Sequence, residues 1–181
     1  MKPKRNTITK LFDGEIKFDK EWITLNINNQ ETNIHINGYF NKKTFEDILE
    51  ILGRLTKSEE RPTISFYHLR TEETDEEEWP ITQLIFTNPG LKYREDTLIL
   101  VDIHHHTDAS ANQKNPDFCY IINKENLCHN ILDLVEKNID TYNKEAKKRV
   151  FEDGKFMFYY PLDEKKYLKI KREILKKLDE R

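Results

Sequence analysis

The stretch Thr97-Leu-Ile-Leu-Val-Asp-Ile-His-His-His-Thr-Asp108 decides how the fold is interpreted. Its first half is apolar and lacks the alternation of polar and apolar residues that marks a strand with one wet face. Leu98–Val101 is therefore expected to form a central strand that is covered on both faces. Three consecutive histidines follow, so this strand is expected to carry polar groups to its own end.

Strand patterns also fill the N-terminal part of the chain. Trp22–Asn28 alternates between apolar and polar residues, and residues 33–37 do the same, which predicts an antiparallel meander. Asp13-Gly14 lies between two further patterns, Thr7–Phe12 and Glu15–Phe18. Because glycine accepts positive φ, Asp-Gly favours a tight hairpin turn at this point.

Three more strands and three helices complete the predicted fold. The strands are expected at Thr63–Leu69, Ile81–Thr87 and Phe118–Ile122. Apolar residues at helical spacing predict a short helix over Thr44–Leu55 and a long one over Lys124–Val150. A last helix is expected after the capping residue Asp163, with an apolar stripe made of Tyr167, Ile170, Ile174 and Leu178.

The predicted class is α+β, because the strand and helix patterns do not alternate regularly. The sheet is expected to be mainly antiparallel, to begin with an N-terminal meander, and to be packed by one short helix and two C-terminal helices. Residues 1–181 suit a single domain, with the C-terminal helical part over residues 124–181. The long helix has a stripe close to a heptad, so a homodimer formed through it is compatible with the pattern.

Composition limits the classes of function. The 181 residues carry a formal net charge of −3, whereas dedicated DNA-binding proteins usually have a strong basic excess. Two cysteines are too few for a disulfide framework. The sequence shows neither a signal peptide nor a transmembrane stretch, so a cytoplasmic protein without a membrane partner is expected. The abundance of Lys, Asn, Ile and Glu favours a bacterial or phage source.

The histidine segment is the first candidate site. Side chains alternate along a strand, so Asp102, His104 and His106 are expected on one side, and imidazole and carboxylate groups suit a divalent metal such as zinc or manganese. A metal-dependent hydrolase, either a phosphoesterase or a nuclease, is therefore one hypothesis. Its ligands would be Asp102, His104, His106 and Asp108. The simpler interpretation is a strand that runs into a polar loop and bonds its histidines locally.

Three residues of the following strand and helix are candidates to complete that site. Cys119, Cys128 and His129 all have side chains that can bind a metal. A cysteine activated by a histidine is a further alternative, with either Cys119 or Cys128 as the nucleophile. Buried thiols are more often inert members of a core, which is the simpler interpretation here.

The second candidate site is an acidic loop between two predicted strands. Like charges repel, so this loop is expected to be extended and hydrated, and to attract a basic partner. The adjacent Trp79 is a natural anchor, because tryptophan supplies a large contact area at small entropic cost. The simpler interpretation is a solvated loop with Trp79 turned into the core. The residues of the partner-binding prediction are Glu72, Glu73, Asp75, Glu76, Glu77, Glu78 and Trp79.

Other patterns are weaker. Aromatic residues in Phe156–Tyr160, next to the lysines of the last two helices, leave RNA binding as a third alternative. The lysines are interleaved with acids, which is more typical of helix solubility than of a phosphate track. The sequence contains no glycine-rich phosphate loop and no Gly-x-Ser-x-Gly motif.

The favoured interpretation is a small cytoplasmic protein-binding or inhibitory module, comparable in kind to bacterial immunity proteins and phage inhibitors. It would engage a basic protein partner through the acidic loop, with nucleic acid an unfavoured partner. In this interpretation the chain is not an enzyme and needs no cofactor. The metal-dependent hydrolase is the alternative.

Overall fold

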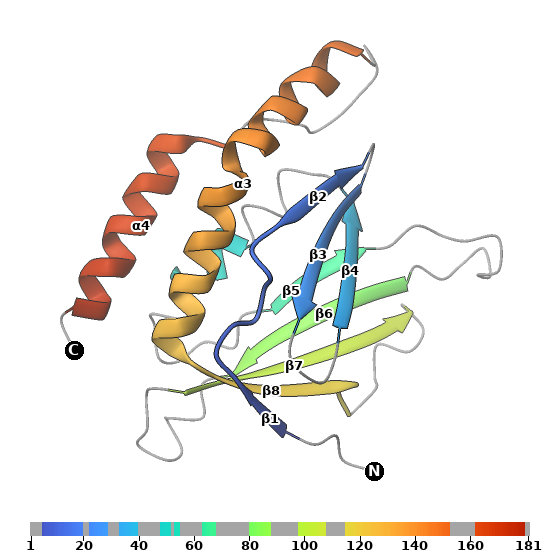
Figure 1. Cartoon of the computed structure of the whole chain (residues 1–181), viewed down its shortest axis with the longest axis vertical. Coiled ribbons are helices and arrows are strands. Elements are labelled where there is room, and N and C mark those ends of the chain that lie inside the picture. The colour runs from blue at the N-terminus through green and yellow to red at the C-terminus, as the bar shows by residue number, and fades with distance from the viewer. Residues whose placement is uncertain are drawn as a thin grey trace.

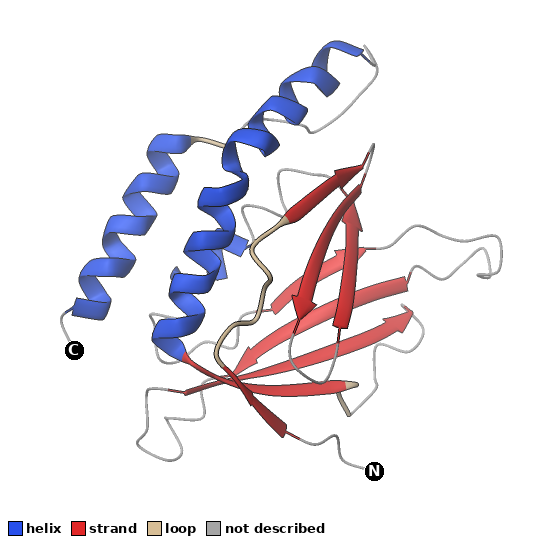
Figure 2. Ribbon diagram, viewed as in Figure 1, coloured by secondary structure: helices blue, strands red, loops and turns tan. Residues whose placement is uncertain are grey.

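The fold is α+β, as the sequence predicts. In a computed structural model, the structure describes residues 5–19, 22–28, 33–39, 48–51, 53–54, 63–67, 80–87, 98–107, 115–152 and 162–179. Two sheets lie on one side of the molecule and two long helices on the other (Figures 1 and 2). The aromatic run over residues 156–160 lies outside the described residues.

The larger sheet has five strands in the order β1-β8-β7-β6-β5. β1 pairs with β8 in parallel, and every other neighbouring pair is antiparallel. The sheet is therefore mostly antiparallel, in agreement with the prediction. Its strands are β1 (Arg5–Ile8), β5 (Thr63–Tyr67), β6 (Pro80–Thr87), β7 (Leu98–Thr107) and β8 (Phe118–Asn123).

β7 is the central strand of this sheet, as its apolar sequence predicts. Ile99, Val101 and Ile103 alternate along it and are fully buried, so they define the inner face of the sheet. Leu98 and Leu100 point to the opposite, outer face and are only partly buried. We expected Leu98–Val101 to be covered on both faces. The inner face is fully covered, whereas the outer face is covered only in part.

The second sheet is antiparallel and has the order β2 (Ile16–Asp19), β3 (Trp22–Asn28), β4 (Asn33–Tyr39). The predicted hairpin at Asp13-Gly14 is wrong, because β1 pairs with β8 and β2 pairs with β3. Gly14 does have the expected positive φ, at 88°. Its turn belongs to a connection that leads from the larger sheet to the smaller one (Figure 1).

Two long helices follow the larger sheet. α3 (Lys124–Glu152) begins directly after β8, where the Asn123 side chain accepts the backbone N–H groups of Glu125 and Asn126. α4 (Glu164–Asp179) begins after Asp163, whose carboxylate accepts two backbone N–H groups of the first turn, at 2.9 and 3.2 Å. The predicted capping role of Asp163 is confirmed.

A short helical segment over residues 48–51 and 53–54 corresponds to part of the helix predicted for Thr44–Leu55. Its buried side chains are Ile48, Leu49 and Ile51. Within the described part of the chain, no helix is both long enough and apolar enough to cross a bilayer.

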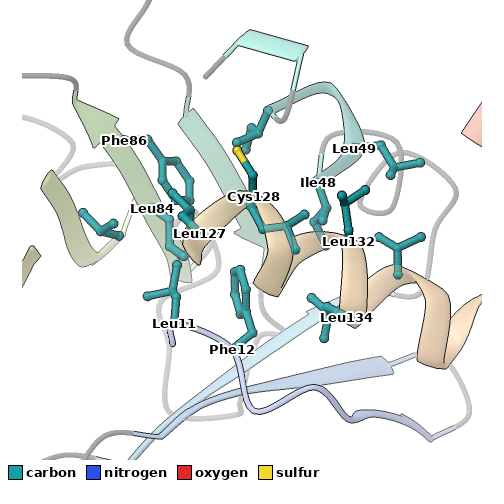
Figure 3. Close-up of a cluster of buried hydrophobic side chains, with 14 of the residues drawn as sticks. Leu11, Phe12, Ile48, Leu49, Leu84, Phe86, Leu127, Cys128, Leu132 and Leu134 are labelled. Atoms are coloured by element: carbon teal, nitrogen blue, oxygen red, sulfur yellow. The ribbon is translucent and has the colours of Figure 1, made fainter. Parts of the chain in front are cut away.

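The core lies between the inner face of the larger sheet, the smaller sheet, α3 and the short helical segment. Leu84 and Phe86 of β6 lie beside Leu127 of α3 there, and Cys128 of the same helix belongs to the same buried cluster (Figure 3). Tyr167 and Ile174 place α4 against the same core, and both are buried. Burial of this apolar surface is the main stabilising contribution to the fold.

Two buried asparagines of α3 hold the connection between β1 and β2. The Asn130 side chain accepts the backbone N–H groups of Leu11 (2.9 Å) and Phe12 (2.7 Å) and donates to the Phe12 carbonyl (2.9 Å). Asn138 accepts the N–H of Ile16 at 3.1 Å and donates to the Gly14 carbonyl at 3.1 Å. These bonds satisfy backbone groups that no strand partner satisfies, so the connection can be buried against the helix.

A third buried asparagine joins the two helices. Asn143 of α3 accepts the backbone N–H of Leu162 at 2.7 Å, and its amide approaches the Leu162 carbonyl at 3.5 Å. Leu162 is buried and stands just before the cap of α4. The bond therefore fixes the point at which the chain enters α4.

Candidate functional site

The acidic loop of the sequence prediction, Glu72–Trp79, lies outside the described residues. The strands on either side of it are described, and they are neighbours. Tyr67 of β5 is paired with Ile81 of β6, so the two ends of the intervening segment start from adjacent positions. β5 is also the last strand in the order of the larger sheet. The acidic segment is thus attached to a hairpin at the margin of that sheet.

Asp102, the first residue of the predicted metal cluster, lies on the outer face of β7. Its partner in the register is Cys119 of β8, and the Cys119 thiol donates to the Asp102 carboxylate with an Sγ–Oδ1 distance of 3.1 Å. Cys119 is buried, whereas Asp102 is partly exposed. The structure therefore joins one of the three additional candidates, Cys119, to the predicted cluster.

His104 lies on the same outer face, as the alternation of side chains predicts. It is buried, with 9% of its surface exposed, and Gln83 of β6 is its register partner. His106 belongs to the same strand, where its backbone is paired with Ile81. Asp108 lies outside the described residues, and so do the surroundings of the His106 side chain.

His105 points to the opposite face from His104 and has its own partners. Its Nδ1 lies 2.9 Å from the Thr82 hydroxyl, and its ring meets the edge of the Phe118 ring with centroids 6.2 Å apart. Its backbone N–H donates to the Asp117 carboxylate at 2.6 Å. These contacts tie β7 to both neighbouring strands, so His105 has a structural role at this end of the sheet.

Cys128 and His129 do not join the predicted cluster. Cys128 is fully buried in the core beside Leu127 (Figure 3), on the inner side of the sheet, whereas Asp102 lies on the outer side. His129 is exposed on α3, where its Nε2 lies 3.9 Å from the Glu125 carboxylate. The prediction that these two residues complete a site with Asp102 is wrong, because the sheet separates them.

A metal centre remains a prediction. Among the residues that the structure describes, no group of three or more His, Cys, Asp or Glu side chains is placed to hold a metal ion. The described part of the cluster consists of Asp102 with its thiol neighbour and of His104. The side chain of His106 and the whole of Asp108 lie outside the described part of the cluster.

A polar contact links α3 to α4 outside the predicted sites. The Lys171 ammonium donates to the Glu136 carboxylate across the two helices. This hydrogen bond lowers the pKa of Glu136 below its ordinary value of 4.5. Burial raises the pKa of Tyr167 well above its ordinary value, and the neighbouring Glu136 adds to the rise. The contact keeps a negative charge of α3 paired with a positive charge of α4.

Sequence reasoning missed the partners of His105, because it treated the alternate histidines as the functional ones. A signal was available: Thr82 and His105 fall on the inner face of their strands, close to where that face meets solvent. A polar residue at an inner-face position needs a hydrogen-bond partner. No such signal marks Asp117, whose role depends on where β8 begins.

Comparisons with known proteins identify no relative from which a function can be inferred. No protein-family model, no curated protein and no solved structure matches the chain.

Proposed function

We propose that the chain is a protein-binding module, of an inhibitory or immunity-like kind, that engages a basic partner through the acidic segment Glu72–Glu78. The observation on which the proposal depends is the gathering of six carboxylates within seven residues, on a chain whose net charge is only −3. Such a concentration of one sign attracts a basic surface and speeds its association.

The attachment of this segment supports the proposal. The residues between Tyr67 and Ile81 connect two paired strands, and β5 is the last strand of the larger sheet. A loop that is presented by two hydrogen-bonded strands has fixed ends, so less of its conformational freedom has to be lost on binding. Trp79 stands directly before β6, next to these charges, and in this proposal it is the apolar anchor of the interface.

Inhibition follows if the basic surface that is covered is itself functional. A basic substrate-binding groove, such as that of an enzyme that acts on nucleic acid, is one whose charge would match the segment. The chain would then act by occupying the groove and would need no chemistry of its own. The metal-dependent hydrolase stays an alternative prediction, because no contact among the described residues favours it.

The test is capture of a partner from a lysate of the source organism by the full-length chain at low salt. The variant Glu76→Lys/Glu77→Lys/Glu78→Lys reverses half of the carboxylates and is expected to lose the partner. The matched control, Glu15→Lys/Asp133→Lys/Asp140→Lys, reverses three exposed carboxylates elsewhere and should retain it. Capture that survives the first set of changes, or that is lost equally in both variants, would refute the role of the segment.

A further inference from the structure

The outward side of α4 has a continuous row of positive charge. Side chains at spacings of three and four residues lie on the same side of a helix. Four exposed cations follow this spacing over twelve residues, with the first and last about 16 Å apart along the axis. They are named the α4 row here and consist of Lys165, Lys169, Arg172 and Lys176.

The α4 row faces away from the core. The opposite side of the helix carries Tyr167 and Ile174, which are buried with 4% and 2% of their surface exposed. α3 packs on that opposite side through Lys171 and Glu136, and α4 forms the margin of the molecule beyond α3 (Figure 1). The row therefore lies on the surface, where another molecule can reach it without any rearrangement of the fold.

The charges of the row are largely unused within the molecule. Among the described residues, the side chains of Lys165, Lys169 and Arg172 make no ion pair. Glu173 lies one helical turn after Lys169 and does not pair with it. Interleaved acids therefore do not neutralise these three members of the row, contrary to the simpler interpretation of the sequence.

An exposed leucine adjoins the row. Leu168 lies next to Lys169 and one turn before Arg172, and 47% of its surface is exposed. It is the one large apolar side chain that is exposed among those that the structure describes. An apolar contact surrounded by cations is the arrangement expected for a small protein interface, where a buried apolar anchor is ringed by charged groups.

The rest of the molecule limits which anion can bind. Removal of the four cations from a net charge of −3 leaves −7 on the remainder of the chain. The neighbouring helix α3 presents acids to solvent, among them Glu125, Asp133 and Asp140. An anion much longer than the row would be repelled by these charges, whereas a short one would not.

We propose that the α4 row binds a short acidic protein segment, whose carboxylates face the row and whose apolar side chain covers Leu168. Nucleic acid fits less well, because a long polyanion runs past the row and gains nothing from an exposed leucine. A lipid surface also fits less well, because helices that lie in the membrane interface need a broad free apolar face. The apolar face of α4 is buried against the core.

This surface is separate from the acidic segment Glu72–Glu78 in sequence and in charge. The proposal does not depend on the proposed function, since the two surfaces attract partners of opposite sign. Together they would allow the chain to contact two different proteins, or two parts of one protein.

The experiment measures fluorescence anisotropy of labelled probes with the full-length chain at low salt. The main probe is a helical peptide of alanine and glutamine with four glutamates at the spacing of the row and one leucine that matches Leu168. Three further probes are the same peptide with glutamine in place of glutamate, an oligothymidylate longer than the row, and vesicles of phosphatidylcholine and phosphatidylserine.

The acidic peptide is expected to bind saturably and more tightly than the three other probes. Lys169→Glu/Arg172→Glu should raise its Kd at least about tenfold, and Leu168→Ser should raise it about threefold or more. The control Lys17→Glu/Lys144→Glu makes the same change in net charge at exposed sites outside the row and should alter the Kd by less than about twofold. Circular dichroism verifies that each variant is folded.

Three outcomes would overturn the proposal. One is the absence of saturable binding of the acidic peptide. Another is tighter binding of the oligothymidylate, with a salt dependence that reports release of about three counterions. The last is vesicle binding that the row reversal abolishes. The variant Glu76→Lys/Glu77→Lys/Glu78→Lys should bind the peptide no less tightly than the parent chain, because the acidic segment takes no part in this binding. The peptide experiment and the capture experiment therefore test the two proposals separately.

Discussion

The buried asparagines of α3 and the histidines of β7 are both polar side chains within apolar elements, yet the structure uses them differently. Asn130 makes three hydrogen bonds to backbone groups that are distant in the sequence, all within 3.0 Å. His104 and His105 lie on opposite faces of one strand, and His105 contacts Thr82 of β6 and Asp117, which directly precedes β8. The asparagine therefore connects separate parts of the fold, whereas the histidine supports the local sheet.

The difference shows that a polar side chain matters most where it replaces missing secondary structure. The connection between β1 and β2 has no strand partner over Leu11 and Phe12, so the amide of Asn130 takes that place. In β7, Leu100–Ile103 have strand partners on both sides, and His104 and His105 are still paired with β6 on one side. Loss of an asparagine should thus cost more stability than loss of a contact made by a histidine, and the following predictions test this order.

The largest loss is expected for Asn130→Ala. The substitution leaves two N–H groups and one carbonyl of Leu11 and Phe12 without partners in a buried place, and each such group costs about 1–3 kcal/mol. A total loss of about 3 kcal/mol or more should lower Tm by roughly 6–12 °C in a chain of this size. Differential scanning calorimetry measures it.

The matched control is Asn126→Ala, at an exposed position one turn earlier on the same helix. It should leave Tm nearly unchanged, because alanine has a higher helix propensity and no buried group loses a partner. Equal effects of the two substitutions would contradict the role assigned to Asn130.

Asn143→Ala should have the next largest effect, about 1–2 kcal/mol. It leaves the buried N–H of Leu162 without its acceptor, while the second contact, at 3.5 Å, is already weak. The loss should be concentrated in α4, so hydrogen exchange of the α4 amides should accelerate more than that of β7. The exposed neighbour Thr141 provides the control as Thr141→Ala. Uniform acceleration across both elements would show that Asn143 does not act locally.

The elements that were predicted correctly have patterns that one element can display by itself. β7 was recognised because an uninterrupted apolar run needs cover from neighbouring strands. α4 was recognised from the cap at Asp163 and from the spacing of Tyr167 and Ile174. In both cases the pattern and its structural consequence lie within a few residues of each other.

Pairing between distant segments could not be predicted in the same way. β1 pairs with β8 in parallel, and nothing within Arg5–Ile8 specifies a partner more than one hundred residues away. The Asp13-Gly14 pair does favour positive φ, but a glycine in this conformation serves a connection between sheets as well as a hairpin. Local turn chemistry therefore fixed the backbone conformation and not the strand that follows it.

The candidate site was likewise predictable only where the pattern lies within a single strand. Alternation placed Asp102 and His104 on one face of β7, which the structure confirms, because Val101 and Ile103 are buried on the opposite face. It could not show that Cys128 lies on the other side of the sheet, because that depends on which face the helix covers. A usable signal was overlooked at Asn138, which occupies an apolar-stripe position after Leu134 and Val135 and is buried.

The third prediction concerns the histidine region. Asp117→Ala removes the acceptor for the backbone N–H of His105, at a place where water can enter because Asp117 is exposed. A loss of about 1 kcal/mol is expected, smaller than for either asparagine. Urea unfolding measures the difference in free energy of unfolding between the parent and the variant, with Asn115→Ala as the exposed control. The variant Asp117→Asn keeps an acceptor oxygen and should retain most of the stability. A loss as large as that of Asn130→Ala would reverse the order argued here.

The smallest effect is expected for the contact between the helices, and it depends on pH. The pKa of Glu136 is lowered in the folded state, chiefly by the hydrogen bond from Lys171, so its contribution is present above the ordinary value of 4.5 and disappears as the pH falls through the folded-state value. Both side chains are about one-third exposed, at 30% and 40%, so Glu136→Gln should cost less than about 1 kcal/mol at neutral pH. Urea unfolding in buffers from neutral to acidic should show the stabilities of the parent and the variant converging at low pH. The control is Asp140→Asn, which changes an exposed carboxylate on the same helix. If the stability difference between the parent and Glu136→Gln widened on acidification, the pairing of Glu136 with Lys171 could not be its cause.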